Sequence, residues 1–284
     1  MSALAPPQPP TGLSGWLGLR LFTALAPRLA KTAPSPPTVE LAPWSALAVP
    51  RRRGRGELAG YHFPAETDPR GAVLLLHPWL PFGQSYFFRR GRIATLRAAG
   101  YDVFTVDLPG FGASGPRAGL LDADVEDVLD HLVTRVAKGP LHLWGVSSGG
   151  YWAHPVLARR EIVAGAVFED VSHHLLEWSR RTVPWSRPLY FVFRTILGEP
   201  YRYLDLKRHA PHLRVRAVAY IGGEDDPGAW AADTRELAAA AGGEVLIVPG
   251  AGHLGAIKVA PEEVVRVALA TFAAAEGYQT ERPA

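Results

Sequence analysis

The feature that most constrains the fold is a regular alternation of short apolar runs with helical patterns, which begins near residue 56. The apolar runs have the length and composition of buried strands, and they lie at residues 72–76, 102–106, 141–144, 163–168, 216–221 and 244–248. Apolar residues with helical spacing lie between them, at residues 87–99, 122–137, 150–160, 230–241 and 261–275. Strands that alternate with helices predict an α/β domain whose mostly parallel central sheet is flanked by helices.

One long interval, residues 173–212, interrupts this alternation. It carries no strand pattern, but it holds many aromatic residues among arginines and prolines, including Trp178 and Trp185. Ligands of open parallel sheets bind at the carboxyl ends of the strands, in pockets that are mostly apolar. We therefore predict a helical cap inserted over that edge, with some of its aromatic side chains directed at the ligand.

The sequence predicts two regions, a Pro-rich N-terminal extension (residues 1–55) and an α/β domain (residues 56–284). Residues 13–29 of the extension have the spacing of an amphipathic helix, which can lie on a membrane surface or pack on its own domain. No apolar run is long enough to cross a bilayer. An uncharged start and Arg20 within the apolar stretch disfavour a signal peptide. We expect a cytoplasmic location, with residues 13–29 as the candidate for a peripheral membrane contact.

Composition excludes several classes of site. The chain has no cysteine, which rules out a disulfide framework, thiolate metal ligands and a cysteine nucleophile. The formal net charge is only +3, so the basic cluster Arg51-Arg52-Arg53-Gly54-Arg55 is interpreted as a solvated basic linker and not as a site for nucleic acid or anionic lipid. No nucleic-acid partner is expected.

The strongest local motif is the G-x-S-x-G pattern of residues 145–149, which follows a strand pattern and precedes a helical one. Ser147 is its central residue, whereas Ser148 does not fit because Val146 and Gly150 lie two positions away from it. A nucleophile on a sharp turn from strand to helix needs small neighbours at those positions. The pattern predicts Ser147 as nucleophile, with the Ser148 amide at the helix start able to bind an oxyanion.

Partners for such a serine follow the last two predicted strands. His253 lies in a Gly-rich loop after residues 244–248, and the acids Glu224, Asp225 and Asp226 follow residues 216–221. A serine hydroxyl needs a base that accepts its proton, and the base needs an acid that fixes its tautomer. The chain therefore offers a complete nucleophile, acid and base set.

The order serine, acid, histidine resembles that of the α/β-hydrolases, and the resemblance covers about residues 57–276. Residues 107–114 are similar to the family's D-x-P-G-x-G-x-S loop, and His77-Pro78-Trp79 stands where the family has its His-Gly-x oxyanion loop. The resemblance implies that the Trp79 amide is the second oxyanion donor. Pro78 replaces the family's glycine and has no N–H to offer.

The resemblance also ranks the candidate acids. The family's usual acid position lies just before Pro227, which selects Asp226. Glu224 and Asp225 remain alternatives, and so does Asp170 at the end of the 163–168 strand, because some relatives take their acid from there. The expected catalytic residues are Ser147, Asp226 and His253.

The expected function is that of an esterase-like or lipase-like serine hydrolase. It would cleave a carboxylic ester or related acyl bond of an apolar small molecule through an acyl-enzyme. The alternatives are a ligand-binding or signalling protein on the same fold, a C–C hydrolase, a thioesterase or an acyltransferase. No metal is expected, because the adjacent His173 and His174 do not point together. No cofactor is expected, because neither of the two G-x-G-x-x-G matches opens directly into a helix, as a dinucleotide-binding motif would.

Overall fold

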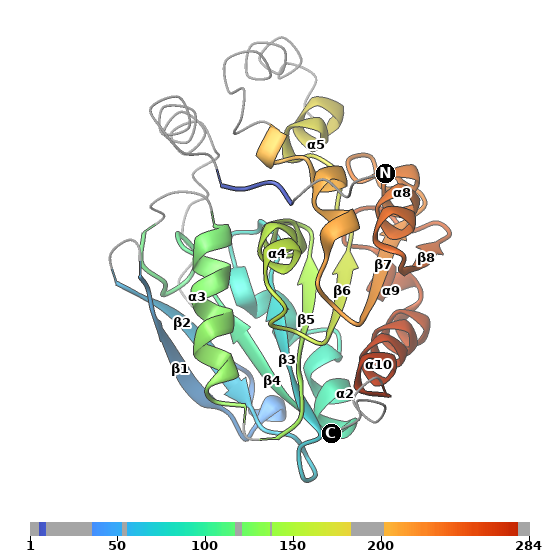
Figure 1. The fold of residues 1–284 in the computed structure, drawn as a ribbon. Helices are drawn as coiled ribbons and strands as arrows, with labels where there is room; N and C mark the ends of the chain where they lie inside the picture. Colours follow the sequence, from blue (N-terminus) through green and yellow to red (C-terminus); the bar gives the residue numbers. More distant parts are fainter. Residues whose placement is uncertain are drawn as a thin grey trace.

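A computed structural model of the chain describes residues 6–9, 36–52, 56–116, 121–136, 138–182 and 202–277. Within these residues, eight strands form one sheet in the order β1-β2-β4-β3-β5-β6-β7-β8, which runs through the middle of the domain (Figure 1). The strands are β1 (Ser45–Pro50), β2 (Glu57–Phe63), β3 (Gly71–Leu76), β4 (Tyr101–Val106), β5 (Leu141–Val146), β6 (Gly165–Glu169), β7 (Ala217–Gly223) and β8 (Glu244–Val248).

The six strands from β4 to β8 in this order run parallel, whereas β1 and β2 are antiparallel to their neighbours. β3 and β5 are buried along their whole length, as expected of parallel strands covered on both faces. This confirms the predicted mostly parallel sheet. Its consequence for function is that the carboxyl ends of β5, β6, β7 and β8 lie along one edge.

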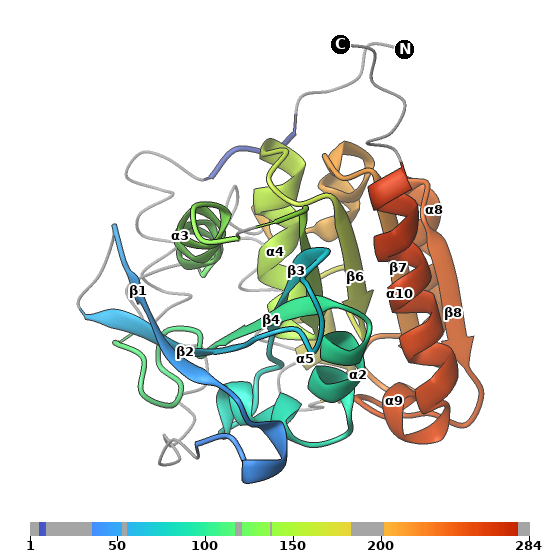
Figure 2. The same ribbon diagram turned by 90° about the horizontal axis from the view of Figure 1, so that it is seen from below.

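Helices cover both faces of the sheet (Figure 2). One apolar cluster packs α3, α4 and α8 on one face and includes the fully buried Val156 of α4. A second cluster packs α2, α9 and α10 on the other face and includes the fully buried Phe272 of α10. The helices are α2 (Arg92–Ala98), α3 (Asp122–Val133), α4 (Ser148–Arg159), α8 (Ala231–Ala241), α9 (Ala256–Val259) and α10 (Pro261–Gly277).

The sheet begins before the predicted domain start at residue 56. β1 pairs with β2 along its length, with Ser45 opposite His62 and Pro50 opposite Glu57, so the boundary at residue 56 divides a strand pair. Neither strand was expected from the sequence. β1 is an edge strand, and only two of its residues, Leu47 and Val49, are buried, so its apolar pattern is weak. It forms a strand because it pairs with β2, which lies farther along the chain.

The interpretation of the basic cluster as a solvated linker is wrong for Arg51, whereas the Arg52 side chain is 60% exposed even though it is paired. The Arg51 side chain is buried, and its Nε donates to Asp124 Oδ1 of α3 at 2.8 Å. The backbone N–H of Arg52 donates to Asp127 of the same helix at 2.9 Å, and its guanidinium also pairs with Asp127. Acidic side chains at the start of α3 therefore anchor this segment, which connects β1 to β2.

The predicted helix at residues 87–99 is shorter in the structure. Its first residues belong to the 3-10 helix η2 (Gly83–Phe88), and α2 begins only at Arg92. Arg90 and Gly91 both have φ of +72°, which a right-handed helix does not accommodate. The positive φ angles separate the two helices.

Part of the predicted cap is described. α5 (Leu175–Thr182) lies above the carboxyl edge of the sheet, near the top of Figure 1, and two 3-10 helices follow later, η4 (Leu206–Arg208) and η5 (Ala210–His212). Residues 183–201, with Trp185, lie outside the described residues, as does the amphipathic helix predicted at residues 13–29. Among the described residues, no helix has the length and apolar character needed to cross a membrane.

Candidate active site

The predicted site residues gather at the carboxyl edge of the sheet. Ser147 directly follows β5, Asp170 follows β6, Asp226 lies on the loop after β7, and His253 lies on the loop after β8. Adjacent parallel strands end at the same edge, so four segments that are far apart in sequence meet there.

Ser147 occupies a strained turn between β5 and α4. Its φ is +49° and its ψ is −115°, outside the regions that a residue with a Cβ ordinarily adopts. The backbone N–H of Ser147 donates to the Glu169 carbonyl at the end of β6, at 2.7 Å. The chain therefore turns sharply while it is still hydrogen-bonded to the sheet.

The glycines around Ser147 are required by close backbone contacts. A Cβ at Gly149 would lie 2.2 Å from the Leu76 carbonyl oxygen of β3, and a Cβ at Gly145 would lie 2.4 Å from the Gly150 Cα. Helix α4 can therefore start against the ends of β3 and β5 only without side chains at these positions. The structure explains the predicted G-x-S-x-G pattern in these terms.

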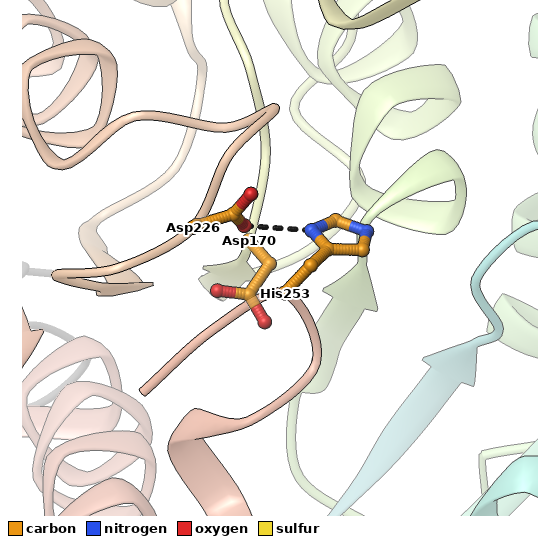
Figure 3. A group of neighbouring side chains, drawn as sticks. All are labelled: Asp170, Asp226 and His253. Atoms are coloured by element: carbon orange, nitrogen blue, oxygen red, sulfur yellow. Dashed lines mark hydrogen bonds and ion pairs between the residues drawn. The ribbon is translucent and has the colours of Figure 1, made fainter. Parts of the chain in front are cut away.

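A hydrogen-bond chain connects Ser147 to a buried acid. Ser147 Oγ lies 3.2 Å from Nε2 of His253. Nδ1 of His253 lies 2.6 Å from Oδ2 of Asp226, the contact that is dashed in Figure 3. The other carboxylate oxygen of Asp226 accepts the N–H groups of Gly228 and Ala229 at 2.8 and 2.9 Å. An ionised carboxylate at Nδ1 favours the tautomer protonated there, which leaves Nε2 as an acceptor for the serine hydroxyl.

The other candidate acids have different surroundings. Glu224 and Asp225 are exposed on the loop after β7. Asp170 is buried beside the Asp226 and His253 pair (Figure 3), but both of its oxygens accept backbone N–H groups, from Gly223 at 3.2 Å and from Leu254 at 2.8 Å. Of the four acids, Asp226 is the one whose carboxylate is hydrogen-bonded to His253.

Burial and charge shift the titration of this group of residues. Burial lowers the pKa of His253, but the hydrogen bond and negative charge of Asp226 outweigh it, so the His253 pKa lies above its usual 6.5. Burial, together with the neighbouring Glu169 charge, raises the pKa of Asp170 to about 8. Asp226 thus favours the protonated form of His253, and the neighbouring Asp170 loses its own proton only at a higher pH than an ordinary aspartate.

The predicted oxyanion loop after β3 is held in place by the His77 ring. His77 is fully buried, its Nε2 accepts the Leu108 N–H at 2.9 Å, and its Nδ1 donates to the Pro78 carbonyl at 2.8 Å. Burial lowers the His77 pKa, in keeping with this neutral tautomer. The hydroxyl of Ser148 donates to the His77 carbonyl at 3.3 Å, which ties the loop to the start of α4. Trp79 follows on the same loop.

A buried ion pair beneath the serine was not anticipated from the sequence. The Nη2 of Arg92, from the start of α2, donates to both Glu169 oxygens at 2.7 and 2.6 Å, and both side chains are completely buried. The indole N–H of Trp144 donates to the same carboxylate at 3.2 Å. Glu169 also provides the carbonyl that receives the Ser147 N–H, so the pair supports the turn from below. Its only sequence signal was an acid at the end of an apolar strand pattern.

The cap reaches the site through α5. The Trp178 ring lies 5.6 Å from the His253 ring, centroid to centroid, and its indole occupies the space that a side chain at position 228 would need. Arg181, one turn farther along α5, donates to the Gly228 carbonyl at 3.0 Å and pairs with Asp233 of α8. One aromatic residue of the predicted cap therefore covers the base.

The side chains of Asp170, Asp226 and His253 form the one cluster, among the described residues, whose donor atoms converge within 4.8 Å as a metal site would require. Their atoms already have other partners, because Nδ1 of His253 faces Asp226 and both Asp170 oxygens accept backbone N–H groups. His173 pairs with Asp233 at 2.9 Å. The donors fit a hydrogen-bonded acid and base better than a cation.

Comparison with known proteins identifies the family and the fold. Residues 73–267 match the model of a family described as the Alpha/beta hydrolase family. An esterase of Pyrococcus furiosus is similar in structure, with a TM-score of 0.69 at 17% identity over 86% of this chain and 94% of its own. A thermophilic esterase from Thermogutta terrifontis has a TM-score of 0.58 at 19% identity, over 82% of this chain and 99% of its own.

A third similar structure is an acylaminoacyl peptidase of Pyrococcus horikoshii, with a TM-score of 0.61 at 16% identity. The match covers 80% of this chain but only 40% of the peptidase. No curated protein matches the chain. At these identities the similar structures establish a common fold.

Proposed function

The chain belongs to the alpha/beta hydrolase family, and from that premise we propose that it is a serine hydrolase. Its reaction is the cleavage of a carboxylic ester, or a related acyl bond, of an apolar small molecule through an acyl-enzyme. The observation that carries the proposal is the hydrogen-bond chain from Ser147 through His253 to the buried Asp226, with Ser147 on a strained turn. The names of two similar structures, both esterases, support the ester as substrate.

In the first half of the reaction, Ser147 Oγ attacks the substrate carbonyl while its proton passes to Nε2 of His253. The imidazolium that forms is stabilised by the Asp226 carboxylate 2.6 Å from Nδ1. The amides of Ser148 and Trp79 hold the developing oxyanion. Nε2–H then protonates the leaving alkoxide, which departs as an alcohol.

In the second half, water replaces the leaving group. His253 Nε2 takes a proton from the water as it attacks the acyl-serine carbonyl, and the collapsing intermediate expels Ser147, which recovers that proton. The products are a carboxylic acid and the free serine.

An apolar acyl group is supported by the aromatic side chains on α5 and on the loop after β3. Trp178 covers His253, Trp79 packs edge to face on Phe111 at 5.0 Å, and Phe82 on the same loop is 46% exposed. Each methylene that an apolar pocket buries contributes about 0.8 kcal/mol. Activity on p-nitrophenyl esters is expected to rise from acetyl to hexanoyl by up to about two orders of magnitude in kcat/KM. A flat series would contradict the apolar pocket.

The nucleophile is tested with two adjacent serines. Ser147→Ala is expected to abolish labelling by a fluorophosphonate probe and to lower kcat by about three orders of magnitude or more, because the attacking oxygen is lost. Ser148→Ala is the matched control, because it keeps the backbone amide that binds the oxyanion and loses only a hydroxyl bonded to the His77 carbonyl. Unchanged labelling of the Ser147→Ala protein would refute the assignment.

The pH profile tests the base and its acid. His253 has to be neutral to accept the serine proton, so kcat/KM falls as the pH drops through the His253 pKa. Because that pKa is raised, half-maximal activity is expected above pH 6.5. Asp226→Asn removes the charge that raises the pKa, and it is expected to lower kcat by about three to four orders of magnitude. A mild effect of Asp226→Asn would move the acid role elsewhere.

A further inference from the structure

Asp170 lies where the two loops of the proposed acid and base come together. It is the first residue after β6, and its side chain is almost completely buried. Oδ1 accepts the N–H of Gly223, the last residue of β7 before the Asp226 loop, and Oδ2 accepts the N–H of Leu254, the residue after His253. One carboxylate thus connects the segment that carries the acid to the segment that carries the base.

The backbone at both ends of one of these hydrogen bonds is strained. Asp170 has φ of +53° and Leu254 has φ of +58°, a region that residues with a Cβ rarely adopt. Such conformations persist where surrounding contacts hold them, and they gather at functional sites. The bond from the Leu254 N–H to Asp170 Oδ2 is a contact of this kind, and it fixes the backbone directly after His253.

We propose that Asp170 is a positioning residue that holds the Asp226 loop and the His253 loop in register, so that the imidazole stays aligned between Asp226 and Ser147. This inference rests on the proposed function of those three residues. Asp170 does not act on the substrate, and its two oxygens are committed to backbone donors. Within the described part of the chain, the other charged groups that face it are Glu169, which is paired with Arg92, and the Asp226 and His253 pair itself.

Two substitutions separate the positioning contacts. Asp170→Asn keeps one acceptor oxygen and the tolerance for positive φ, but its NH₂ group cannot accept the second N–H. Asp170→Ala loses both contacts. We expect kcat to fall about tenfold in Asp170→Asn and about a hundredfold in Asp170→Ala, with KM changed less than about twofold, because misalignment affects the transition state more than substrate binding.

A carboxylate elsewhere provides the control. Asp102 lies at the start of β4, at the opposite end of the strands, where its Oδ1 accepts the Ala65 N–H at 2.9 Å and lies 3.6 Å from His62 Nε2, so Asp102→Asn replaces another carboxylate that accepts a backbone N–H. Its kcat is expected to stay within about twofold of the unchanged protein. The second readout is the low-field NMR resonance of the His253 Nδ1 proton, which reports the bond to Asp226 without any turnover. It is expected to shift or broaden in both Asp170 variants and not in Asp102→Asn.

The outcomes distinguish this inference from the proposed function. If both folded Asp170 variants keep the unchanged kcat and the unchanged Nδ1 resonance, positioning by Asp170 is wrong. If Asp170→Asn is as damaging as Asp226→Asn, Asp170 is itself the acid and the inference is equally wrong. If the unchanged protein cleaves no ester but its Nδ1 resonance is lost in the Asp170 variants, the proposed function fails and the positioning role stands.

Discussion

Replacing Asp170 by asparagine removes an ionisable group that the folded chain holds in its protonated form over an unusually wide pH range. The pKa of an unperturbed aspartate is 3.8, whereas burial and the nearby Glu169 charge raise that of Asp170 to about 8 in the folded chain. Between these two values the folded protein keeps a proton that the unfolded chain has lost. The contribution of Asp170 to stability therefore falls as the pH rises from about 4 to about 8, and Asp170 adds no further slope above that.

The size of this effect follows from the linkage of protons to folding. One proton bound by the folded state alone changes the free energy of unfolding by about 1.4 kcal/mol for each pH unit, or roughly 3 kcal/mol over two units. Asp170→Asn also loses one hydrogen bond from a backbone N–H, which costs about 1 to 2 kcal/mol at every pH. The difference in the free energy of unfolding between the two proteins is thus expected to change with pH, in addition to a constant loss from the missing hydrogen bond.

Urea unfolding at intervals between about pH 5.5 and about pH 9.5 measures this slope. The free energy of unfolding of Asp170→Asn, minus that of the unchanged protein, is expected to increase by roughly 3 kcal/mol between about pH 5.5 and pH 7.5. It is expected to level off above about pH 8, and this plateau is the internal control. A difference that stays constant across the whole range would refute the raised pKa of Asp170 and the burial argument behind it.

Two further substitutions test the support of the serine turn. Glu169→Gln leaves the completely buried Arg92 guanidinium without its carboxylate. It is expected to lower the free energy of unfolding, measured by urea titration, by about 3 to 5 kcal/mol. A loss below about 1 kcal/mol would contradict the role of the buried pair. Gly149→Ala places a Cβ 2.2 Å from the Leu76 carbonyl oxygen, and it is expected to slow fluorophosphonate labelling at least about tenfold. Gly252→Ala is the control, because a Cβ at Gly252 meets no atom closer than 3.9 Å, and this variant should label normally. Equal labelling of the two alanine variants would argue against the steric role of Gly149.

Much of the fold could be predicted from the sequence because its signals are local. Each of the six parallel strands is a short apolar run, and the helices between them repeat their apolar residues every three to four positions. The position of Ser147 is local as well, since the close contacts of Gly145 and Gly149 impose a pattern within five consecutive residues. Order along the chain then placed His253 and an acid after the last two strands.

The antiparallel edge of the sheet, formed by β1 and β2, could not be predicted in this way. β1 and β2 carry half-buried patterns, and they become strands because they pair with each other and with β4. The partners of Arg51 and Arg52 could not be predicted either, because their ion pairs with Asp124 and Asp127 form only when α3 packs against this segment. Charge patterns alone do not say which opposite charges the fold places nearby.

Within the site, the sequence by itself determined which residue types are present and in what order, and the tertiary structure decided which of them touch. Four acids were compatible with the motif, and only the packing of the loops after β6, β7 and β8 set Asp226 against His253 and turned Asp170 toward two backbone N–H groups. The reason is physical. A hydrogen bond depends on distances of a few tenths of an ångström between segments tens of residues apart, and the parallel sheet fixes those distances by bringing the strand ends to one edge.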